Sequence, residues 1–569
     1  MPFGNSPSQS RSDGIKIGQR FNARRHGVSP ASPAGTTEIG TPAHSSFVPP
    51  GLGRVVRSSP SVETLGYFHP VPLGRGRLSF RKALELGAIL SLLLIAGCGG
   101  KGFDAALVLT QTPTYSMSAA SSHDILDQRY PVGSRVVIAL APFRPSDARV
   151  LSEGLAAAGG PVVSPSGNRI LFVGKAQAGD TWQIYETKPS GGRLKSVTAM
   201  DGGAMDPAIL SNGDLVFSSP VPKAGESWRS GKLPALYAQA PQGQPRRLTF
   251  GSTAAVEPTV LGDGRILFVS ARLSTNPTDA PNLALFTVNN DGTEVTAFAL
   301  DRDGAPLVQR PRELRDGRVG FLATDIGTPA GEMWAEAVRT ARPFASRAKL
   351  FSFPVSQCRS VEPAENGNLL VSFETRAVSG LPAGAAQAGS FAIYRVGTNA
   401  ATLGQPLFDD PAWNDIEAAR VAARANPMGH ISAMVPTKKT GTILCLNANF
   451  IRLRGTNNTQ VAKAARVRVL TGDGVGSARP LGEVPLRADG SFLAEVPADI
   501  PLGFESLDAD GRVLSQLAPA FWVRPGENRS CLGCHEPYNR SPRNVRPLAA
   551  FFPSVKLTEK PPTVAQQVP

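Results

Sequence analysis

The chain has 569 residues, more than one ordinary domain, so two or three domains with separate cores are expected. Its formal net charge is +14, but residues 1–97 carry 11 Lys and Arg against 4 Asp and Glu, which is half of the surplus. The remainder is only mildly basic, and this argues against nucleic-acid binding as the explanation of the high isoelectric point. Abundant Gly and Pro, with apolar residues in short runs between turns, predict an all-β protein.

The N-terminal region is composed of two different segments. Residues 1–74 are rich in Ser, Pro, Gly and Arg without apolar periodicity, which is typical of a disordered tail. Residues 75–97 join basic residues to a short apolar run and small residues, and this predicts a secretory signal peptide rather than a membrane span. Such a tail does not normally precede a signal peptide, so we expect translation to start downstream, near Leu73 or Leu78.

The signal segment ends in I-A-G-C at Cys98, which resembles a bacterial lipobox. The resemblance implies a lipid on the Cys98 thiol, cleavage before it and anchoring on the periplasmic side of the membrane. An aspartate directly after the lipid-bearing cysteine would retain the protein in the inner membrane. This chain has Gly99 at that position, which favours the outer membrane. The alternatives are a buried hydrophobic helix and a signal anchor with an incidental cysteine.

A repeated pattern follows, in which a Pro, a few apolar residues and a Gly-containing turn lead into a strand ending in Phe. Its turn glycines are 46, 51, 53 and 50 residues apart, and they are Gly167, Gly213, Gly264, Gly317 and Gly367. This spacing predicts a β-propeller over residues 98–415, with hairpin turns at the glycines. Strand-like segments at 105–112, 135–141 and 416–422 could together close a further blade, so five to six blades are expected.

The remainder of the chain predicts a second, smaller domain. Residues 416–436 contain two prolines, Pro427 and Pro436, and are expected to form a linker. Alternating strands and two Asp-Gly hairpin signals between 437 and 545 predict a small antiparallel β-sandwich. Residues 546–569 are expected to be a disordered tail.

The sandwich leads into C-L-G-C-H, from Cys531 to His535. Two thiols three positions apart, followed by a histidine, are typical of covalent haem attachment, because each thiol adds to one vinyl group of the porphyrin. We therefore predict one haem c on Cys531 and Cys534, with His535 on the iron. A structural zinc site would need a fourth ligand, and a thioredoxin-like dithiol would need a βαβ context.

Three further residues bear on this site. His430, in the linker, is a candidate distal iron ligand, and the alternative is a solvated side chain. Cys358 and Cys445 could form a disulfide that joins the propeller to the sandwich. Alternatively, Cys445 is a buried thiol in an apolar strand.

The stretch from about Thr437 to Pro537 resembles the middle domain of the hydrazine synthase alpha subunit. The likeness rests on K-K-T-G-T-I-L-C-L-N, L-G-E-V-P-L-R-A-D-G-S-F and W-V-R-P-G-E-N-R-S-C-L-G-C-H-E-P. It implies a propeller followed by a c-type haem domain. It also implies a tyrosine after the motif as iron ligand, with the motif histidine, here His535, on zinc. Tyr538 is the matching candidate, although it lies one residue closer than the family pattern.

These features predict an exported, lipid-anchored c-type haem protein that takes part in periplasmic redox or electron transfer. The chain has one C-x-x-C-H motif and no second haem domain of the family, so a redox protein partner is expected to supply the second centre. One alternative is a haem enzyme that acts on small nitrogen or oxygen species. The other is a propeller scaffold for protein or polysaccharide binding, with a structural haem. The sequence identifies no acid–base set and therefore no catalytic residue.

Overall fold

The structure is a computed structural model, in which part of the chain can be described. The described residues are 106–113, 129–220, 233–272, 282–299, 307–324, 334–343, 345–351, 358–374, 390–398, 400–449, 463–472, 478–533 and 545–557. The expected tail at 1–74, the signal peptide at 75–97 and Cys98 lie outside these residues. Within the described ranges, no helix is both long and apolar enough to cross a membrane.

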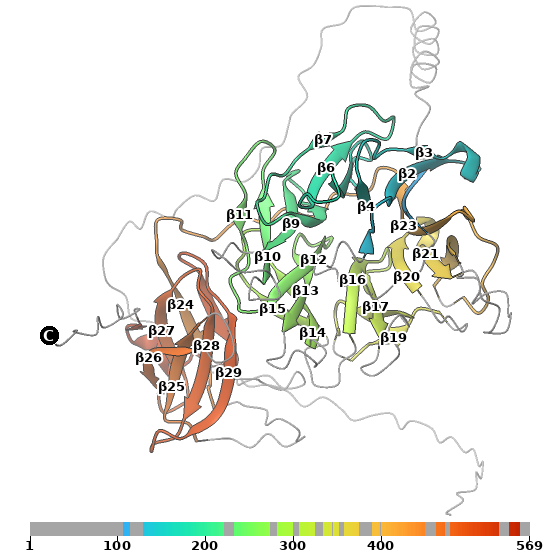
Figure 1. The fold of residues 1–569 in the computed structure, drawn as a ribbon. Coiled ribbons are helices and arrows are strands. Elements are labelled where there is room, and N and C mark those ends of the chain that lie inside the picture. Colours follow the sequence, from blue (N-terminus) through green and yellow to red (C-terminus); the bar gives the residue numbers. More distant parts are fainter. Residues whose placement is uncertain are drawn as a thin grey trace, which may run out of the picture. The chain divides into compact units, whose positions relative to one another are not determined.

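Six small antiparallel sheets follow one another around a ring (Figure 1). The first sheet contains β1 (Ala106–Pro113), β2 (Arg135–Leu140), β3 (Arg149–Val150) and β23 (Trp413–Val421). The next two are β4 (Ala157–Val163), β5 (Ile170–Lys175), β6 (Gln183–Thr187) and β7 (Lys195–Ser196), then β8 (Met205–Ile209), β9 (Leu215–Pro220), β10 (Pro234–Gln239) and β11 (Arg246–Arg247). The last three are β12 (Ala254–Val260), β13 (Ile266–Arg272), β14 (Asn282–Val288) and β15 (Thr296–Ala299), then β16 (Leu307–Glu313), β17 (Arg318–Thr324), β18 (Trp334–Arg339) and β19 (Ala348–Lys349), and finally β20 (Cys358–Pro363), β21 (Asn368–Glu374) and β22 (Phe391–Gly397). Short 3-10 turns lie at η2 (Pro145–Asp147) and η4 (Glu365–Gly367).

The two ends of the propeller meet in one blade. β23 pairs antiparallel with β1, from Ala106 opposite Val421 to Pro113 opposite Trp413. The last strand of the propeller in chain order, β23, therefore lies in the same blade as the first three strands, β1 to β3. This arrangement confirms the propeller and gives it six blades. It also corrects the expected linker, because residues 416–421 are part of β23 and the linker begins after Val421.

The blades are held together by apolar cores that lie between neighbouring sheets. The phenylalanine that ends each predicted repeat is buried there, at Phe172, Phe217, Phe268, Phe321 and Phe373. Four of them lie beside an aromatic ring of the following strand, with ring centroids 5.8 to 6.4 Å apart. Since one sheet cannot bury both faces alone, this packing explains why the repeats stack radially. These aromatic residues therefore belong to the apolar cores.

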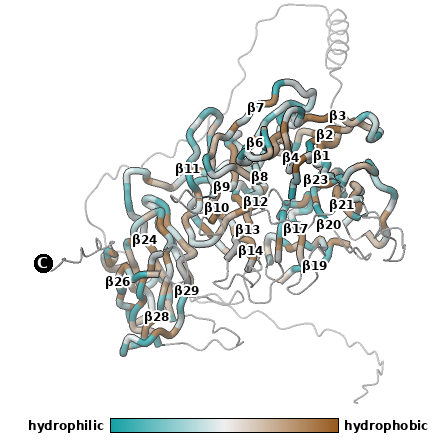
Figure 2. The backbone as a smooth tube through the Cα atoms, in the orientation of Figure 1, coloured by the Kyte–Doolittle hydropathy of each residue, from teal (hydrophilic) through white to brown (hydrophobic). Residues whose placement is uncertain are grey.

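The second domain is a sandwich of two four-stranded sheets (Figure 1). One sheet has the order β30 (Asn528–Cys531), β24 (Thr440–Cys445), β27 (Phe492–Pro497) and β31 (Val555–Lys556). The other has the order β26 (Arg479–Pro485), β25 (Arg466–Thr471), β28 (Leu502–Leu507) and β29 (Val513–Phe521). Buried and half-buried residues alternate along β24 and β27. Figure 2 shows that hydrophobic and hydrophilic residues both occur within the sandwich. The buried residues form one core between the sheets.

Two features of the sandwich differ from the sequence prediction. β30 pairs parallel with β24, and β31 pairs parallel with β27, so the first sheet is mixed rather than wholly antiparallel. Residues 546–557 are not a disordered tail, because η5 (Leu548–Phe551) and β31 pack against the sandwich. The amides of Leu548 and Ala549 donate to Asp489 Oδ2 at 2.7 Å and Ser491 Oγ at 2.9 Å.

Candidate functional site

The C-L-G-C-H motif begins at the end of β30. Three of its residues, Cys531 to Gly533, are described, whereas Cys534, His535 and Tyr538 lie outside the described residues. Cys531 is the register partner of Cys445 on β24, and the Leu446 amide donates to the Cys531 carbonyl at 2.9 Å. β30 thus fixes the first cysteine of the motif at the edge of a sheet.

The two paired cysteines lie on the inner side of this sheet. Cys445 is buried, with 1% of its surface exposed. Cys531 is half-buried and packs against the same apolar core. Because paired residues on adjacent parallel strands point to the same face, both side chains approach the core side by side. Leu532, the next residue, is 41% exposed, so the chain reaches the surface directly after Cys531.

Of the two alternatives for Cys358 and Cys445, the disulfide is wrong, and a buried Cys445 in an apolar strand is correct. Cys358 is a free thiol at the start of β20, where it packs in a core of the propeller. Its Sγ donates to the Ser360 carbonyl at 3.6 Å, and burial raises the pKa of this thiol strongly. Cys445 packs in the sandwich core instead. Each cysteine thus contributes to the core of its own domain.

The segment that precedes β30 anchors the motif to the propeller. The Trp522 indole donates to the Gly292 carbonyl at 3.0 Å and is buried in a propeller core. The Arg524 guanidinium lies over the Phe250 ring, at 4.7 Å from its centroid, and donates to the Arg247 carbonyl at 2.9 Å. Both side chains reach from the sandwich to the propeller. Trp522 contacts the blade formed by β12–β15, and Arg524 contacts the neighbouring blade formed by β8–β11.

Two more residues continue this contact up to the motif. Glu527 accepts the Glu294 amide at 2.9 Å and the Arg524 amide at 2.7 Å, and burial raises the pKa of its carboxyl. Arg529 forms an ion pair with Glu294, and it donates to the Val295 carbonyl at 2.5 Å. We call Trp522, Arg524, Glu527 and Arg529 the seam residues. Arg529 lies two positions before Cys531, so the seam holds β30 between the two domains.

A shallow cavity lies beside the seam. It has a volume of about 70 Å³, and most of its lining is apolar, including Phe268, Phe286 and Trp522. The hydroxyl-bearing residues of its lining are Thr249, Thr253 and Ser270. That space holds roughly two water molecules, which is far too little for a haem. A porphyrin at Cys531 would therefore stand outside this cavity.

The linker that carries His430 runs along the propeller. The Arg424 amide donates to the Pro165 carbonyl at 2.8 Å, and the Met428 amide donates to the Gly262 carbonyl at 2.9 Å. His430 Nε2 lies 3.9 Å from Asp291 Oδ2, and Ser432 Oγ donates to the same oxygen at 2.6 Å. Although burial opposes it, the bonds from Ser432 and Thr293 lower the pKa of Asp291. The structure thus places His430 of the linker beside the propeller loop, at Asp291 and Gly292, that also accepts the Trp522 indole. Its role as a distal ligand stays a prediction.

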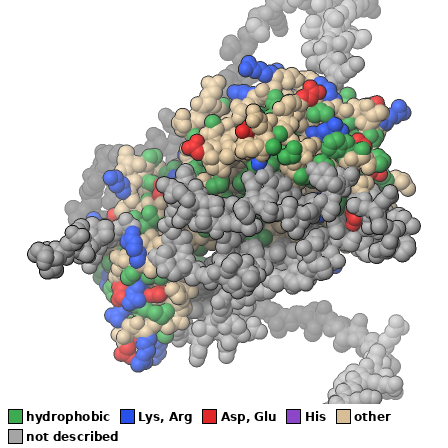
Figure 3. All heavy atoms as spheres, in the orientation of Figure 1, with side chains coloured by type: hydrophobic (Ala, Val, Ile, Leu, Met, Phe, Trp, Pro, Cys, Tyr) green, Lys and Arg blue, Asp and Glu red, His purple; other side chains and the backbone are tan. Residues whose placement is uncertain are grey.

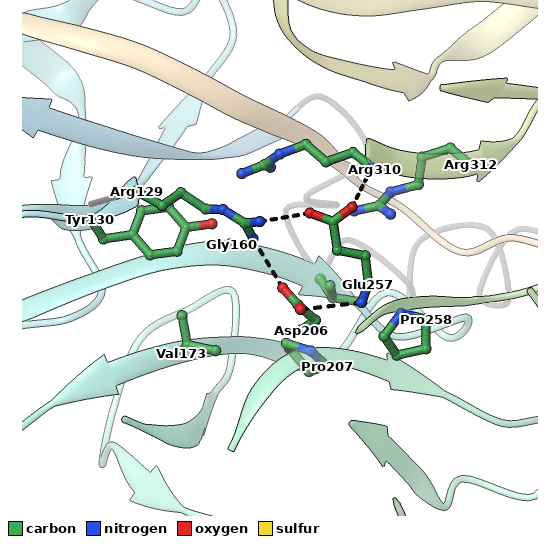
Figure 4. A pocket seen from close by; sticks show the side chains of 11 residues that line it. Arg129, Tyr130, Gly160, Val173, Asp206, Pro207, Glu257, Pro258, Arg310 and Arg312 are labelled. Atoms are coloured by element: carbon green, nitrogen blue, oxygen red, sulfur yellow. Dashed lines mark hydrogen bonds and ion pairs between the residues drawn. The ribbon is translucent and has the colours of Figure 1, made fainter. Parts of the chain in front are cut away.

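A second cluster of charged residues lies in the centre of the propeller (Figure 4). Arg129 donates to Asp206 at 3.0 Å and to Glu257 at 2.6 Å. Arg310 is paired with Glu417. The carboxylates also receive backbone amides, because Asp206 accepts the Glu257 amide at 3.2 Å and Glu257 accepts the Arg310 amide at 2.5 Å. The remaining cavity is about 30 Å³, room for roughly one water. The centre of the ring is therefore filled by the protein's own side chains.

The pKa values in this central cluster follow from burial and pairing. Burial opposes the charge on Arg129, but Asp206 and Glu257 raise its pKa well above the ordinary value. Burial likewise opposes the charge of Glu417, but Arg310 and Arg129 lower its pKa. Burial raises the pKa of Asp206. The cluster is thus a paired network that fills the ring.

Neither the central cluster nor the seam was predicted from the sequence. In three of the predicted repeats, a charged residue directly precedes the proline, namely Asp206, Glu257 and Arg310. This recurring charged position is the sequence signal that could have revealed the central cluster. The seam residues were noticed only as part of a family resemblance. Among the described residues, no group of three or more His, Cys, Asp and Glu side chains could hold a metal ion.

The fold and the sequence motif together define a class of protein, a six-bladed propeller joined to a β-sandwich in which a C-x-x-C-H motif begins at the last residue of β30. Residues 439–536 match the hydrazine synthase alpha subunit middle domain, and this segment of the chain belongs to that family. The match confirms the resemblance seen in the sequence.

Similarity to solved structures extends over more of the chain. Hydrazine synthase of Kuenenia stuttgartiensis is similar with a TM-score of 0.67 and 18% sequence identity, over 79% of this chain and 72% of that chain. TolB from Acinetobacter baumannii is similar with a TM-score of 0.32 and 14% identity, over 53% of this chain and 68% of that chain. The first likeness supports the propeller–sandwich fold, and the second is too remote to support an inference. No curated protein sequence matches the chain.

Proposed function

We propose that the protein is an exported, lipid-anchored c-type haem protein that takes part in periplasmic redox or electron transfer. The observation that carries this proposal is the C-x-x-C-H motif at the end of β30, in a domain of the hydrazine synthase alpha family. The seam residues support it, because they join the strand that carries Cys531 to the propeller.

The donor set fits a c-type haem. Cys531 and Cys534 would hold the porphyrin through thioethers, and His535 would bind the iron. If the ligands follow the family pattern, Tyr538 binds the iron and His535 binds zinc. Cys531 is half-buried, and the chain becomes exposed at Leu532, so a porphyrin can stand at the protein surface. When bound, the haem would supply an iron centre that changes its oxidation state by one electron.

The cellular setting belongs to the same proposal. The signal segment at 75–97 and the lipobox cysteine Cys98 support anchoring on the periplasmic side, and Gly99 favours the outer membrane. One haem per chain supports a redox protein as partner. On the face drawn in Figure 3, basic and acidic side chains are interspersed, and this supports a partner other than nucleic acid.

A second candidate function is favoured by the family match. A haem enzyme acting on small nitrogen or oxygen species would agree with membership of residues 439–536 in a hydrazine synthase domain family. This activity needs an open coordination position on the iron, whereas electron transfer is compatible with two axial protein ligands. The spin state of the iron therefore distinguishes the two candidates.

The test uses the whole chain, expressed with its own signal segment in a host that matures c-type cytochromes. Haem staining after denaturing electrophoresis tests covalent attachment, with Cys531→Ser as the matched control. A low-spin spectrum that His430→Ala converts to high spin supports electron transfer with His430 as distal ligand. A high-spin spectrum that shifts with nitric oxide supports the enzyme. Absence of covalent haem contradicts both.

A further inference from the structure

The pairing of β24 and β30 brings together two cysteines that the sequence separates by more than eighty residues. Cys445 and Cys531 are register partners on adjacent parallel strands. Neighbouring strands lie about 4.8 Å apart, and disulfides form when Cα atoms are roughly 4.4 to 6.8 Å apart. The strand pairing therefore meets the backbone requirement for a disulfide.

The side chains meet the second requirement, which is a common direction. Both cysteines pack against the same sandwich core, Cys445 fully and Cys531 at its margin. Along β30, Arg529 and Cys531 are less exposed than Asn528 and Ser530, so the inward side of this strand carries Cys531. Cys531 is thus the accessible member of the pair, and Cys445 is the shielded member.

We propose that Cys445 and Cys531 form a disulfide in the haem-free protein, and that this bond withholds Cys531 from haem attachment until it is reduced. The Cys531 thiolate attacks a disulfide of a thiol oxidase, which gives a mixed disulfide and one released thiol. The Cys445 thiolate then attacks the Cys531 sulfur and releases the second thiol of the oxidase. Two protons leave the pair, and its two electrons reduce the oxidant's disulfide.

The consequence depends on the proposed haem attachment at Cys531. A sulfur bound to Cys445 cannot add to a vinyl group, so reduction of this bond must precede maturation. Cys531 is only half-buried, at the margin of the core, and this position gives a dithiol reductant access to that sulfur. Cys445 then acts through Cys531, because its bond to Cys531 determines when haem attachment can begin.

The disulfide itself is tested by peptide mapping of the whole haem-free chain. The protein is oxidised with glutathione disulfide, alkylated and digested with trypsin. We expect residues 440–452 to be joined to residues 530–540, with a mass two hydrogens below the sum of the two peptides. Because the second peptide holds both motif cysteines, the link must persist in Cys534→Ser and disappear in Cys531→Ser. Cys358, buried in the propeller, is the internal control and remains unlinked.

The opposite result is equally distinct. A peptide 530–540 closed on itself between Cys531 and Cys534, with Cys445 alkylated, would overturn the proposal. The effect on maturation is read separately, as the haem-stained fraction of Cys445→Ala against the wild type when reductant is limiting, and an unchanged fraction contradicts the timing role. A link to Cys445 in a protein that never takes up haem would refute the haem function but leave the disulfide in place.

Discussion

At the scale of single residues, the centre of the propeller shows why charged groups are buried there. The first strand of most blades contains a bulge, and Asp206, Glu257, Arg310 and Glu417 occupy such positions with φ between 51° and 59°. A bulge removes an amide from the ladder, and that amide needs another acceptor. The carboxylate of the preceding blade supplies it, as between Asp206 and the Glu257 amide and between Glu417 and the Gly160 amide.

Glu417 is the residue whose loss should be most damaging. It is paired with Arg310 and accepts the Tyr130 hydroxyl at 2.7 Å and the Gly160 amide at 2.9 Å. Glu417→Gln keeps the shape but leaves Arg310 buried without its counter-charge, so we expect a loss of about 3–5 kcal/mol in the free energy of unfolding. Urea denaturation measures this loss.

The matched control is an exposed carboxylate of similar chemistry. Asp510 faces Arg512 at 3.7 Å, and both side chains are more than 70% exposed. Asp510→Asn should therefore change the stability by less than about 0.5 kcal/mol. Equal effects of the two substitutions would show that the central pairing does not stabilise the ring.

Asp415, on β23, makes the closing blade sensitive to pH. Burial raises its pKa to about 8, and the carboxylates of Asp410 and Asp409 add to this, although bonds from the Asp410 amide and Gln111 oppose it. Since the folded-state pKa lies above the ordinary carboxyl value, the folded protein binds a proton that the unfolded chain releases. The stability contributed by Asp415 is thus fully present below about pH 4 and is lost as the pH rises through about 8.

We therefore expect the melting temperature of the wild type to fall between about pH 5 and about pH 8 relative to Asp415→Asn, which cannot titrate. Scanning calorimetry of both proteins over this range measures the difference. Parallel pH profiles would contradict the assignment of Asp415 as the titrating group.

At the scale of elements, the hairpin turns of the propeller reverse the chain, and some of them also contact the linker. All five predicted turn glycines have φ between +74° and +89°, so the repeat signal correctly identified positions that require glycine. The sequence could not show that some of these turns also contact the linker. A Cβ at Gly264 would lie 2.4 Å from the Met428 carbonyl oxygen, whereas a Cβ at Gly213 would meet nothing within 4 Å.

This difference provides a matched pair of substitutions. Gly213→Ala and Gly264→Ala impose the same backbone strain, because φ is +86° at one glycine and +89° at the other. Only Gly264→Ala also displaces the linker backbone, so it should destabilise the protein more and should increase tryptic cleavage after Arg424, the one trypsin site between 424 and 436. Urea denaturation and limited trypsin digestion measure the two effects. If both variants behave alike, the linker does not depend on this turn.

At the scale of the whole molecule, the sequence predicted which domains are present better than it predicted how distant strands pair and how the two domains contact each other. Repeats and alternation identified the propeller and the sandwich, because both depend on local patterns. The parallel pairing of β30 with β24 joins strands far apart in the chain, and no local pattern encodes it. The same holds for the seam, where Trp522 and Arg529 contact a propeller hairpin more than 200 residues earlier.

The seam should make the two domains unfold as one unit. Trp522 is buried in a propeller core, and Arg529 is paired with Glu294 beside the Val295 carbonyl. The double substitution Trp522→Phe and Arg529→Met removes these polar contacts and retains most of the apolar volume. We expect one calorimetric transition in the wild type and two in the double variant, because each domain keeps its own core.

The control is Arg468→Met, which breaks only the pairs with Glu483 and Glu505 on the sandwich. It should lower the stability slightly and leave one transition. Two transitions already present in the wild type would mean that the seam positions β30 without coupling the domains.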